Sequence, residues 1–382
     1  MGHSSSSRVE PLPPARWENT SSYGLIFIGT KAQLIKTAPV IKELDKRGLS
    51  YRLVYTGQHS ETFRELEACF GIRSADQVLV PDAEADSKFS FLTWAVRFAL
   101  AVIQSLLRGE WRSARWGLVH GDTASTLFSA IALKMARVPV VHIEAGLRSP
   151  RLMSPFPEEL VRRLVSRMTA LHLAPDGAAA ENLAGARGKV VDTRGNTIRD
   201  VLGMALESKA GGIHEGGAGG FGIVSMHRNE NLSNRQRLDE ILRAVQLAAN
   251  HCRLKFVLHP VTRRRLESTG WIGRLESQEN LELLPRMDYP NFIACMLQSS
   301  FLLTDGGSNQ EEAAMLGLPT MLLREETERS DGIGDSVSMA GHGLEGVPQF
   351  VQEKRGKRWA IRPLAKHSPS AFIVDVLEQE FE

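Results

Sequence analysis

Three carboxylates in the first half of the sequence stand where acid–base chemistry could use them. Asp122 follows the apolar segment GLVHG, Glu144 ends VPVVHIE, and Glu158 opens a helix. A carboxylate that closes a buried apolar run needs a partner or a purpose, because burying a charge is costly. Grouped carboxylates can stabilise a cation-like centre and exchange a proton with it. The alternatives are that Asp122 is a helix N-cap and that Glu158 and Glu159 complement a helix dipole.

A glycine turn in the second half could hold a phosphate. The segment SFLLTD is followed by GGSN (306–309) and then by a helix. Glycines let backbone N–H groups approach a ligand closely, and the helix N-terminus favours negative charge, so the turn could cradle a diphosphate. Ser308 and Glu311 could equally form a capping box that only starts the helix. Glu312 would then remain available to a ligand.

Cationic groups follow two further strands. Lys31 and Lys36 come after LIFIG, and His227 and Arg228 come after GIVSM. The lysines are either diphosphate contacts or solvated surface residues, and an isolated histidine would more often be structural. Phosphate-binding groups, several carboxylates and a histidine together indicate a nucleotide-activated sugar. The sequence has no nucleophile elbow, HExxH motif or Walker loop.

Predicted strands and helices must position these residues. The sequence alternates short apolar runs, typical of strands, with segments whose apolar residues recur at helical spacing. From residue 24 onward the strand candidates are LIFIG, YRLVYT, GLVHG, VPVVHIE and ALHLAP, and after a glycine-rich break GIVSM, KFVLH, LELL, SFLLTD and TMLL. Their continuous hydrophobicity is typical of parallel strands covered on both faces. The pattern predicts an α/β fold with two Rossmann-like, doubly wound parallel-sheet domains facing a central cleft at the carboxyl ends of the strands.

The same pattern sets the expected domain bounds. We expect a disordered leader over 1–23, an N-terminal domain over 24–206, a glycine-rich linker over 207–222, a C-terminal nucleotide-binding domain over 223–360, and a C-terminal helix over 361–382 that crosses back to the N-terminal domain. Gly217, Gly219 and Gly222 match the spacing of the dinucleotide fingerprint. We reject that interpretation because the motif precedes a strand instead of opening a helix.

Composition excludes several classes of protein. The 382 residues carry a net charge of +2 and are 42% apolar, which is typical of a globular protein and argues against nucleic-acid binding. Three dispersed cysteines give neither a disulfide framework nor metal-ligand spacing, which fits the cytoplasm. No segment is expected to be a clean membrane span. The apolar helix over 91–107 is predicted to be core or a subunit contact instead of a lipid anchor.

Eight colinear blocks resemble the UDP-N-acetylglucosamine 2-epimerase family: GTKAQLIKTAPVIKEL, TGQHSETF, VHGDTAST, HIEAGLRS, SPFPEE, GNTIRDVL, MHRNENL and TDGGSNQEEA with LGLP and RxxTER. The resemblance implies the GT-B architecture, no metal or other cofactor, and a homodimer. It also implies an isomerase that eliminates UDP in the anti sense to give 2-acetamidoglucal and re-adds UDP on the other face.

The resemblance assigns roles to individual residues. The catalytic carboxylates are Asp122, Glu144 and Glu158, and His227 assists the UDP group. The expected substrate-binding residues are Lys31, Lys36, Gln58, His59, Arg162, Arg228, Phe292, Gly306, Gly307, Ser308 and Glu312. Within this set Glu312 matches the acid that binds the ribose hydroxyls and Phe292 lies in the segment that receives uracil. Gln58 and His59 match positions near the sugar or an allosteric substrate site.

Some positions depart from the family pattern. Lys31 replaces the usual Arg, which loses a bidentate phosphate fork. Ala32-Gln33 replaces Pro-Glu, and the usual D-S-G-G is Asp305-Gly306-Gly307-Ser308. Ser60 replaces the Arg that usually follows the histidine, and Ser330-Asp331 replaces Pro-Glu after TER. Because the carboxylates are intact, we expect retained chemistry with an altered substrate or altered regulation.

Several activities fit these residues. The first is a non-hydrolysing 2-epimerase that makes UDP-N-acetylmannosamine for a surface polysaccharide. The second is a hydrolysing 2-epimerase that releases UDP and N-acetylmannosamine. A 2-epimerase of another UDP-N-acetylated or diacetamido sugar, a GT-B glycosyltransferase and a non-catalytic UDP-sugar sensor also fit.

Overall fold

A computed structural model describes residues 22–57, 61–81, 88–149, 157–209, 215–327 and 329–381. The chain divides into two compact units. Unit 1 comprises Met1–Val201 with His367–Glu382, and unit 2 comprises Leu202–Lys366. Most of the expected leader, together with Gln58 and His59, lies outside the described residues. Each unit is described by itself below.

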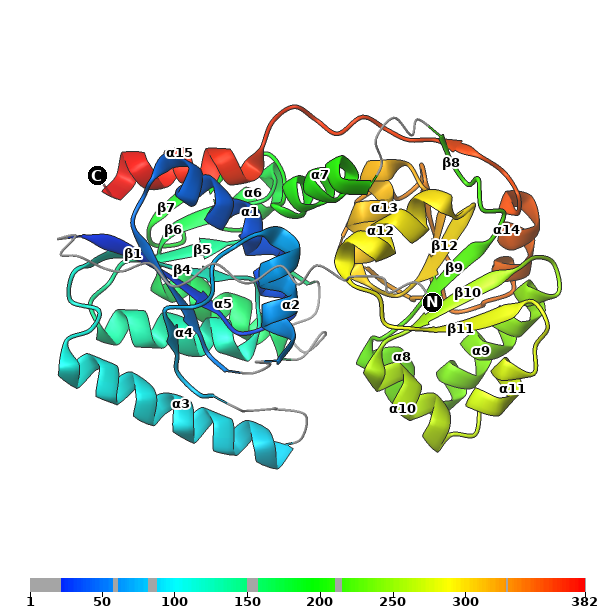
Figure 1. Ribbon diagram of the computed structural model, residues 1–382, viewed down its shortest axis with the longest axis horizontal. Coiled ribbons are helices and arrows are strands. Elements are labelled where there is room, and N and C mark those ends of the chain that lie inside the picture. Colours follow the sequence, from blue (N-terminus) through cyan, green and yellow to red (C-terminus); the bar gives the residue numbers. More distant parts are fainter. Residues whose placement is uncertain are drawn as a thin grey trace, which may run out of the picture. The chain divides into compact units, whose positions relative to one another are not determined.

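Unit 1 is built on a parallel sheet. In its described part the sheet has seven strands in the order β3-β2-β1-β4-β5-β6-β7 (Figure 1). The strands are β1 (Tyr23–Ile28), β2 (Tyr51–Tyr55), β3 (Gln77–Val78), β4 (Ala114–His120), β5 (Val140–Ile143), β6 (Thr169–Ala174) and β7 (Lys189–Asp192). The central strands are almost wholly buried, which explains their continuous apolar sequence.

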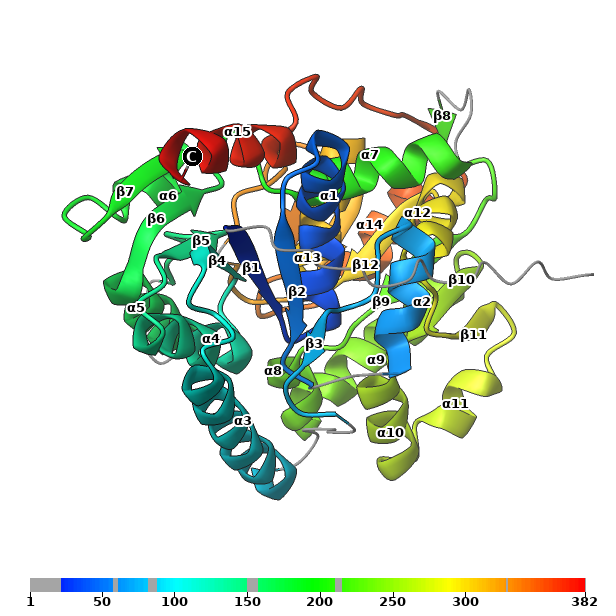
Figure 2. The same ribbon diagram turned by 60° about the vertical axis from the view of Figure 1, so that its left-hand side comes forward.

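Helices cover both faces of this sheet. On one face lie α3 (Lys88–Arg108), α4 (Ala124–Met135) and α5 (Glu158–Met168), and on the other lie α1 (Lys31–Arg47), α2 (Glu61–Phe70) and α15 (Pro369–Phe381), as Figures 1 and 2 show. The short α6 (Gly177–Glu181) follows β6. Arg47 on α1 binds Asp375 and Glu378 on α15, with N–O distances of 2.6 Å each. The C-terminal helix is therefore part of unit 1.

Unit 2 has a second parallel sheet. Its described strands pair in the order β11-β10-β9-β12-β13-β14, with a separate antiparallel pair β15-β8. The strands are β8 (Glu215–Gly216), β9 (Gly222–Ser225), β10 (Leu254–Leu258), β11 (Leu281–Pro285), β12 (Phe301–Thr304), β13 (Thr320–Leu322), β14 (Val337–Met339) and β15 (Trp359–Ala360). With unit 1, this confirms the predicted fold class of two parallel-sheet α/β domains.

Two separate apolar cores hold the helices of unit 2. Residues of α9 (Arg235–Ala249), α11 (Ile272–Glu276) and α14 (Gly346–Lys354) pack in one core, and residues of α12 (Tyr289–Gln298) and α13 (Gly307–Leu316) pack in the other. The short α8 (Asn229–Ser233) and α10 (Pro260–Ser268) follow β9 and β10. Each fully buried large apolar side chain contributes about 1.5–3 kcal/mol to such a core.

The glycine-rich segment is more structured than a simple linker. The boundary between the units falls within α7 (Ile198–Lys209), and β8 already pairs with β15. The amides of Gly217 and Gly219 donate to the carbonyls of Leu297 and Gln298. Gly217, Gly219 and Gly222 lead into β9, which agrees with the rejection of a dinucleotide fingerprint.

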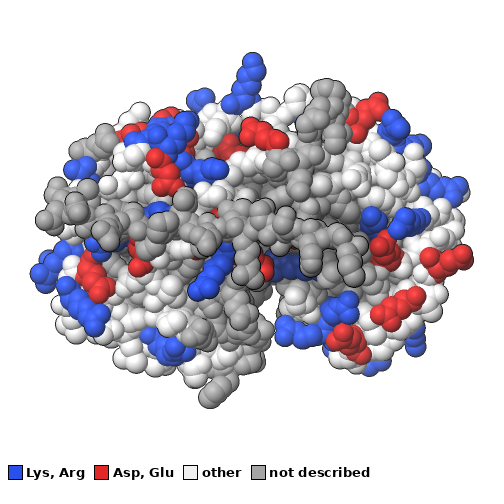
Figure 3. Space-filling model, viewed as in Figure 1, with Lys and Arg blue, Asp and Glu red and all other residues white. Residues whose placement is uncertain are grey.

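Charged side chains of both signs are mixed on one face of the molecule. On the face drawn in Figure 3, Lys and Arg side chains are interspersed with Asp and Glu side chains over each unit. This mixture matches the near balance of 46 basic against 44 acidic residues in the sequence. A nucleic-acid-binding surface would instead gather Lys and Arg on one face or along one helix.

The expectation that no segment has the length of a membrane span needs correction. The stretch Ser90–Arg108 of α3 is long and apolar enough, by length and composition alone, to cross a bilayer. One face of the helix nevertheless packs in the core of unit 1 through Trp94, Phe98 and Val102. The helix is amphipathic within a globular unit, which agrees with the interpretation of 91–107 as a helix that contributes to the core.

Candidate active site

Three adjacent strands of unit 1 bring the predicted carboxylates to one edge of the sheet. β4 lies between β1 and β5, and all three run parallel. The turns after Ile28, His120 and Ile143 therefore meet at the carboxyl ends of neighbouring strands. The first turn leads into α1, the second contains Asp122 and the third begins with Glu144.

Glu144 is the acceptor of a buried ion pair. The ammonium of Lys36 lies 2.9 Å from Oε1 and 3.0 Å from Oε2 of Glu144. Asn196 Nδ2 donates to Oε1 at 2.9 Å, and His120 Nε2 lies 3.6 Å from Oε2. Glu144 also has a φ of 63°, a left-handed conformation that costs energy for a side chain other than glycine. Strained backbone with a fully engaged carboxylate is typical of a functional position.

This arrangement gives Lys36 a partner that sequence reasoning missed. Lys36 is buried, so the alternative of a solvated surface lysine is wrong for it. Its one described ion pair is with Glu144, 108 residues away in the chain. The assignment of Lys36 to the diphosphate stays a prediction. Lys31 lies in the first turn of α1 and is half-buried.

Asp122 is held by Arg162. The guanidinium Nε and Nη2 lie 2.8 Å and 2.6 Å from Asp122 Oδ2, and the Asp122 side chain remains 28% exposed. Thr123, not Asp122, is the N-cap of α4, so the capping alternative for Asp122 is wrong. Arg162 was expected to bind substrate, and the structure adds that it orients a carboxylate. Asp122 is thus fixed in place but accessible.

His142 supports the turn that carries Asp122. Its Nε2 lies 2.7 Å from the carbonyl oxygen of Gly121. Burial lowers the pKa of His142 to about 3, partly offset by that hydrogen bond. The neutral imidazole therefore carries its proton on Nε2 and donates it to Gly121, because the carbonyl can only accept. Sequence reasoning did not identify this residue.

The two glutamates at the start of α5 differ in environment. Glu159 is wholly buried and accepts from the backbone N–H of Ser149 at 3.0 Å and from Arg163 Nε at 2.9 Å. Glu158 has a buried Oε2 that finds no hydrogen-bond partner among the described residues. The segment 150–156 before the helix lies outside the described residues. The difference marks Glu159 as structural and Glu158 as the residue with capacity for a ligand.

In unit 2, Asp305 organises the ends of β9 and β12. It is fully buried and accepts from the backbone N–H groups of His227 at 2.9 Å and Arg228 at 3.0 Å, and from Asn231 Nδ2 at 3.0 Å. His227 Nδ1 lies 3.8 Å from Asp305 Oδ1, with the His227 side chain 42% exposed. Burial of part of the ring, with the charges of Arg228 and Arg286, lowers the pKa of His227 against the opposing effect of Asp305.

The glycine turn after β12 lies beneath three cationic or imidazole side chains. A Cβ at Gly306 would lie 3.0 Å from His227 Cε1, and a Cβ at Gly307 would lie 3.1 Å from Arg329 Nε and 3.6 Å from Arg228 Nη2. Gly306 is the N-cap of α13 without a side-chain cap, so the capping-box alternative for Ser308 is wrong. Two guanidiniums and a helix N-terminus around glycine form a site suited to phosphate.

Arg329 is a further site residue that the predicted set omits. Its Nη1 lies 2.7 Å from Oε2 of the buried Glu311, which fixes the guanidinium beside Gly307. The sequence did offer one indication, because Arg329 belongs to the TER block of the family resemblance. An arginine in such a block is a candidate for binding phosphate. Its position could not be derived from spacing, since the contact with Glu311 lies 18 residues away in the chain, across the end of α13, β13 and the loop that follows.

Glu312 and Phe292 lie on α13 and α12. Glu312 is buried and lies near Tyr289. Burial, followed by the charge of Glu312, raises the pKa of Tyr289 well above its usual value, so the phenol stays protonated. Phe292 is half-buried against the core of α12. Their expected contacts with ribose and uracil stay predictions.

Comparisons with known proteins identify the relatives of this chain. The family profile described as UDP-N-acetylglucosamine 2-epimerase matches residues 42–353. The UDP-N-acetylglucosamine 2-epimerase of Neisseria meningitidis is 30% identical over 85% of this chain and 88% of the relative. That of Bacillus subtilis is 29% identical over 86% of each.

Solved structures agree with the sequence relatives. The Neisseria meningitidis UDP-GlcNAc 2-epimerase bound to UDP-GlcNAc has a TM-score of 0.75 at 27% identity, covering 94% of this chain and 100% of that chain. The Methanocaldococcus jannaschii enzyme in complex with UDP-GlcNAc and UDP has a TM-score of 0.79 at 23% identity, covering 94% and 99%, and supports the fold. The chain therefore belongs to the UDP-N-acetylglucosamine 2-epimerase family, a family of isomerases.

Proposed function

We propose that this chain interconverts UDP-N-acetylglucosamine and UDP-N-acetylmannosamine without net hydrolysis. The observation that carries the proposal is the pair of anchored carboxylates at adjacent strand ends, Asp122 held by Arg162 and Glu144 held by Lys36 and Asn196. The membership of the family supports the same reaction. A nucleotide-sugar transferase would not need a base at C2, so it leaves this carboxylate arrangement unexplained.

The reaction begins with loss of UDP. The C1–O bond to the diphosphate breaks with its electron pair on the departing UDP, and C1 becomes cation-like. A carboxylate takes the C2 proton, and the C2–H electrons form the C1–C2 double bond of 2-acetamidoglucal. UDP then adds back at C1 while C2 receives a proton on the opposite face. Carboxylates placed near C1 lower the barrier by stabilising its developing positive charge.

We assign the catalytic carboxylate roles to Asp122, Glu144 and Glu158. Asp122 is accessible and oriented, and Glu158 has a buried oxygen without a partner among the described residues, so both have capacity to exchange a proton. Glu144 is fully engaged by Lys36 and Asn196, which suits a fixed negative charge more than a proton carrier.

We assign the diphosphate to the turn that begins α13. Gly307 supplies a backbone N–H group at the helix N-terminus, and Arg228 and Arg329 beside it supply positive charge. The backbone N–H of Gly306 donates to Thr304 Oγ1. The assignment of Lys31 and Lys36 to the diphosphate follows from the family resemblance alone. His227 has a lowered pKa, so its neutral ring can donate one hydrogen bond to the leaving diphosphate without adding a charge that would hold UDP too tightly. Ser308, Glu312 and Phe292 complete the proposed uridine side.

The remaining assignments follow from the family. Gln58 and His59 are proposed to lie near the sugar or an allosteric substrate site. The product is proposed to serve surface polysaccharide synthesis in the cytoplasm, with the chain acting as a homodimer and requiring no metal or other cofactor.

The decisive experiment is incubation with UDP-N-acetylglucosamine in D2O, followed by proton and phosphorus NMR. Deuterium at C2 with UDP still attached, and a new manno anomeric signal, is the expected result. Accumulation of free UDP with N-acetylmannosamine would replace the proposal by a hydrolysing epimerase. Exchange only with a UDP-diacetamido sugar would keep the chemistry and change the substrate.

Two variants separate an epimerase from a glycosyltransferase and from a sensor. Asp122→Asn and Glu144→Gln should each abolish C2 exchange while UDP binding, measured by calorimetry, persists. Transfer of sugar to an acceptor that survives both changes would indicate a glycosyltransferase. Binding of UDP-sugars by the unchanged protein, with no C2 exchange and no UDP release from any of them, would indicate a sensor.

A further inference from the structure

The chain that follows β13 is bound to the start of α13 by the side chain of Gln310. Gln310 lies near the N-terminus of α13 and is wholly buried. Its backbone N–H donates to the carbonyl of Gly306 at 3.0 Å, so Gln310 belongs to the turn that carries the proposed diphosphate site. A side-chain amide has two N–H donors and an accepting oxygen, and a buried one must find partners for them.

The described partners of this amide all lie in the chain that follows β13. Gln310 Nε2 donates to the carbonyl of Arg329 at 3.2 Å and to that of Asp331 at 3.1 Å. Gln310 Oε1 accepts from the hydroxyl of Thr327 at 3.0 Å. The two carbonyls can only accept, so the nitrogen of the amide must face them and the oxygen must face Thr327. The chemistry of the partners therefore fixes the orientation of the amide.

These hydrogen bonds fix both backbone polar groups of Arg329. The carbonyl of Arg329 accepts from Gln310 directly. The N–H of Arg329 donates to Thr327 Oγ1 at 3.3 Å, and the same hydroxyl donates to Gln310 Oε1. The next residue of α13 binds the side chain, since Glu311 Oε2 lies 2.7 Å from Arg329 Nη1. Two consecutive residues of one helix thus hold the backbone and the guanidinium of one arginine.

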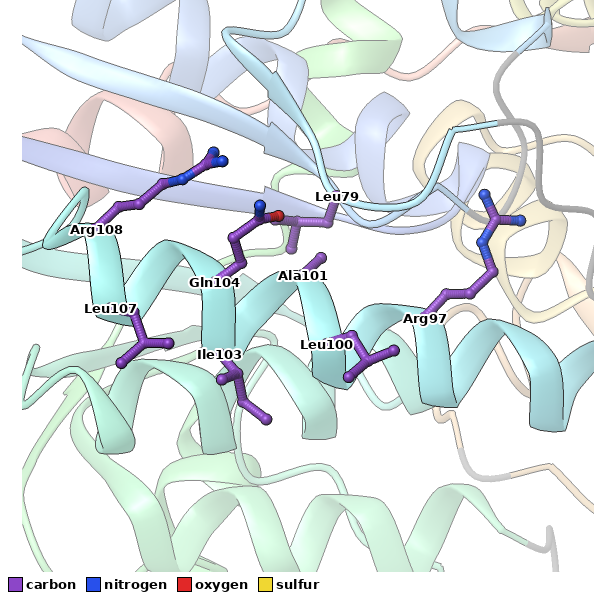
Figure 4. A pocket seen from close by; sticks show the side chains of 8 residues that line it. All are labelled: Leu79, Arg97, Leu100, Ala101, Ile103, Gln104, Leu107 and Arg108. Atoms are coloured by element: carbon purple, nitrogen blue, oxygen red, sulfur yellow. The ribbon is translucent and has the colours of Figure 1, made fainter.

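Two arginines of unit 1 show the contrast with an ordinary surface guanidinium. Figure 4 shows Arg97 and Arg108 extending from α3 beside a groove along that helix. The Arg108 side chain is 62% exposed, and its guanidinium lies 3.6 Å from Glu110. Surface pairs of this kind contribute little, because two long side chains must lose their freedom to form them. The Arg329 side chain is only 13% exposed, so contacts within the protein set its position.

The guanidinium of Arg329 is held beside the N-terminus of α13. A Cβ at Gly307 would lie 3.1 Å from Arg329 Nε, and Gly307 is the first residue of the helix. Unpaired backbone N–H groups at a helix N-terminus favour an anion, and a guanidinium adds directed donors to it. Because a hydrogen bond weakens steeply as its geometry departs from the optimum, the placement of this donor matters to a ligand. A side chain that only filled space at Gln310 would not need to be an amide.

We propose that Gln310 is a positioning residue for the diphosphate of the nucleotide. It does not touch the ligand. It binds the backbone of Arg329, directly and through Thr327, and so keeps the guanidinium beside the N-terminus of α13. The inference rests on the proposed diphosphate site at α13 and adds the residue that sets the geometry of that site.

The first test measures UDP binding by calorimetry in the full chain carrying Gln310→Met. Methionine keeps the length of the side chain and removes its hydrogen bonds. The Kd for UDP should rise about tenfold, at the lower end of the rise expected when the guanidinium of Arg329 itself is removed. Leu316→Ala is the control, because Leu316 is a buried residue of the same helix outside this network. It should lower stability towards urea and leave the Kd unchanged.

Two results of this test would overturn the inference. One is an unchanged Kd in Gln310→Met. The other is an equal rise of the Kd in Gln310→Met and Leu316→Ala, because the loss of affinity would then follow from lost stability alone. Urea unfolding of both variants shows how much stability each has lost.

A second test asks whether Gln310 acts through Arg329. In a protein that already carries Arg329→Gln and Glu311→Gln, adding Gln310→Met should weaken UDP binding no further, because the guanidinium that Gln310 positions is gone. Residues that act through one contact show such non-additive effects. A further tenfold loss in this background would mean that Gln310 affects UDP by another route, and the positioning role would be wrong.

The dependence of the Kd on ionic strength is a measurement that a purely structural role would not change. Added salt screens the attraction between UDP and the cationic groups of the site, so the affinity of the unchanged protein should fall as salt is added. The affinity of Gln310→Met should fall less steeply, with the same slope as the protein carrying Arg329→Gln and Glu311→Gln. Weaker binding with the slope of the unchanged protein would show that Arg329 is still in place, contrary to the inference.

A pair of variants at the half-buried Thr327 tests the same network without a change in α13. Thr327→Ser keeps the hydroxyl that joins Arg329 N–H to Gln310 Oε1, so it should keep the affinity for UDP. Thr327→Val has nearly the same shape as the original residue but no hydroxyl, and it should weaken binding. Equal affinities in the two variants would contradict the role of this hydroxyl in positioning Arg329.

Failure of the proposed diphosphate site would give a different result from failure of this inference. If the unchanged protein binds UDP no better than the protein with Arg329→Gln and Glu311→Gln, the diphosphate does not use Arg329, and the inference falls together with that part of the site. If those two changes weaken binding but Gln310→Met and Thr327→Val do not, the site stands and Gln310 does not position it.

Discussion

Gln33 Nε2 donates to the carbonyl oxygen of His120 at 2.7 Å, and this bond joins the first turn of α1 to the end of β4. The same amide group donates to Thr126 Oγ1 at 2.8 Å, and its oxygen accepts from the backbone N–H of Gly29 at 2.8 Å. The absence of a Cβ on Gly29 makes room for Ser125, so the two turns can pack this closely. One neutral side chain thus braces the turn that carries Asp122.

The Gln33 brace predicts a pH-dependent defect in Gln33→Glu. An ionised carboxylate would face the His120 carbonyl, which can only accept, so the folded state should raise the pKa of the introduced glutamate above its unfolded value. The protonated acid can donate, so its stabilising contribution is present at low pH and is lost as pH rises through the raised pKa. Urea unfolding should show a deficit of about 1–3 kcal/mol against the unchanged protein at pH 7.5 that narrows at pH 5.

Gln33→Leu is the control for that experiment. It removes the same hydrogen bonds to the His120 carbonyl and the Gly29 amide but has nothing to titrate, so its deficit should stay constant with pH. A Gln33→Glu deficit that also stays constant would mean that the Thr126 hydroxyl alone satisfies His120, to which it donates at 2.7 Å.

His142 predicts a loss of stability in acid. Its folded pKa is lowered by burial to about 3, whereas an unfolded histidine titrates near 6.5. Below about pH 6.5 the unfolded chain takes up a proton that the native chain refuses, so stability falls with pH by up to about 1.4 kcal/mol per unit until the folded pKa is reached.

The variant His142→Gln tests this prediction. An amide can still donate to Gly121 but does not titrate, so the variant should lose about 2 kcal/mol less than the unchanged protein between pH 7 and pH 5. Unfolding by urea across that range is the measurement. If the unfolding free energy changed with pH equally in both proteins, His142 would be protonated in the folded state or would have no role in acid sensitivity.

The positions of the site residues were predictable, but their partners were not. A buried apolar run ends where its strand ends, so Asp122, Glu144 and His227 could be placed at strand ends from the sequence alone. The Lys36–Glu144 pair depends on which strands become neighbours and in which register, because its two residues are 108 positions apart. For the same reason the ion pair between Arg162 and Asp122 could not be predicted from the sequence.

Helix starts were harder to predict for a local reason. Asp122 and Ser308 both have side chains suited to capping, yet Thr123 and Gly306 occupy the N-cap positions. A shift of one or two residues in where a helix begins decides whether a polar side chain caps the backbone or is left for a ligand. Composition alone does not fix that residue.

The buried pair Lys36–Glu144 predicts that stability and activity can be separated. Lys36→Met leaves Glu144 with Asn196 but without its cation, which should cost about 3–5 kcal/mol of unfolding free energy. Lys36→Met combined with Glu144→Gln removes both charges and should recover much of that stability. Deuterium exchange at C2 should stay abolished in the double variant. Recovery of exchange along with stability would assign the pair a purely structural role.

Arg329 predicts a loss of UDP affinity. Arg329→Gln removes a guanidinium beside Gly307, and a hydrogen bond to a charged group is worth about 1.5–3 kcal/mol, so the Kd for UDP should rise about 10- to 100-fold. Arg329→Gln also removes the ion pair of the buried Glu311. Glu311→Gln is therefore added in the same protein to restore its stability. Arg253→Gln is the control, since Arg253 is an exposed arginine of unit 2 that pairs with Glu282. Calorimetry in which the Arg329 and Arg253 variants bind UDP equally well would remove Arg329 from the site.

Glu158 and Glu159 provide a comparison between adjacent residues of one helix. Glu159→Gln replaces a buried carboxylate that accepts from Ser149 and binds Arg163, so it should lower the unfolding free energy by about 1–3 kcal/mol and reduce C2 exchange only through that instability. Glu158→Gln disturbs no hydrogen bond among the described residues and should leave the unfolding curve unchanged while it lowers the rate of C2 exchange 100-fold or more, the upper range for a lost acid–base group being about 10⁴. Urea unfolding and exchange in D2O, measured on both variants, give each residue two independent values. A fully active Glu158→Gln protein would leave Asp122 as the accessible carboxylate of the described site and would require the proton to be returned from elsewhere.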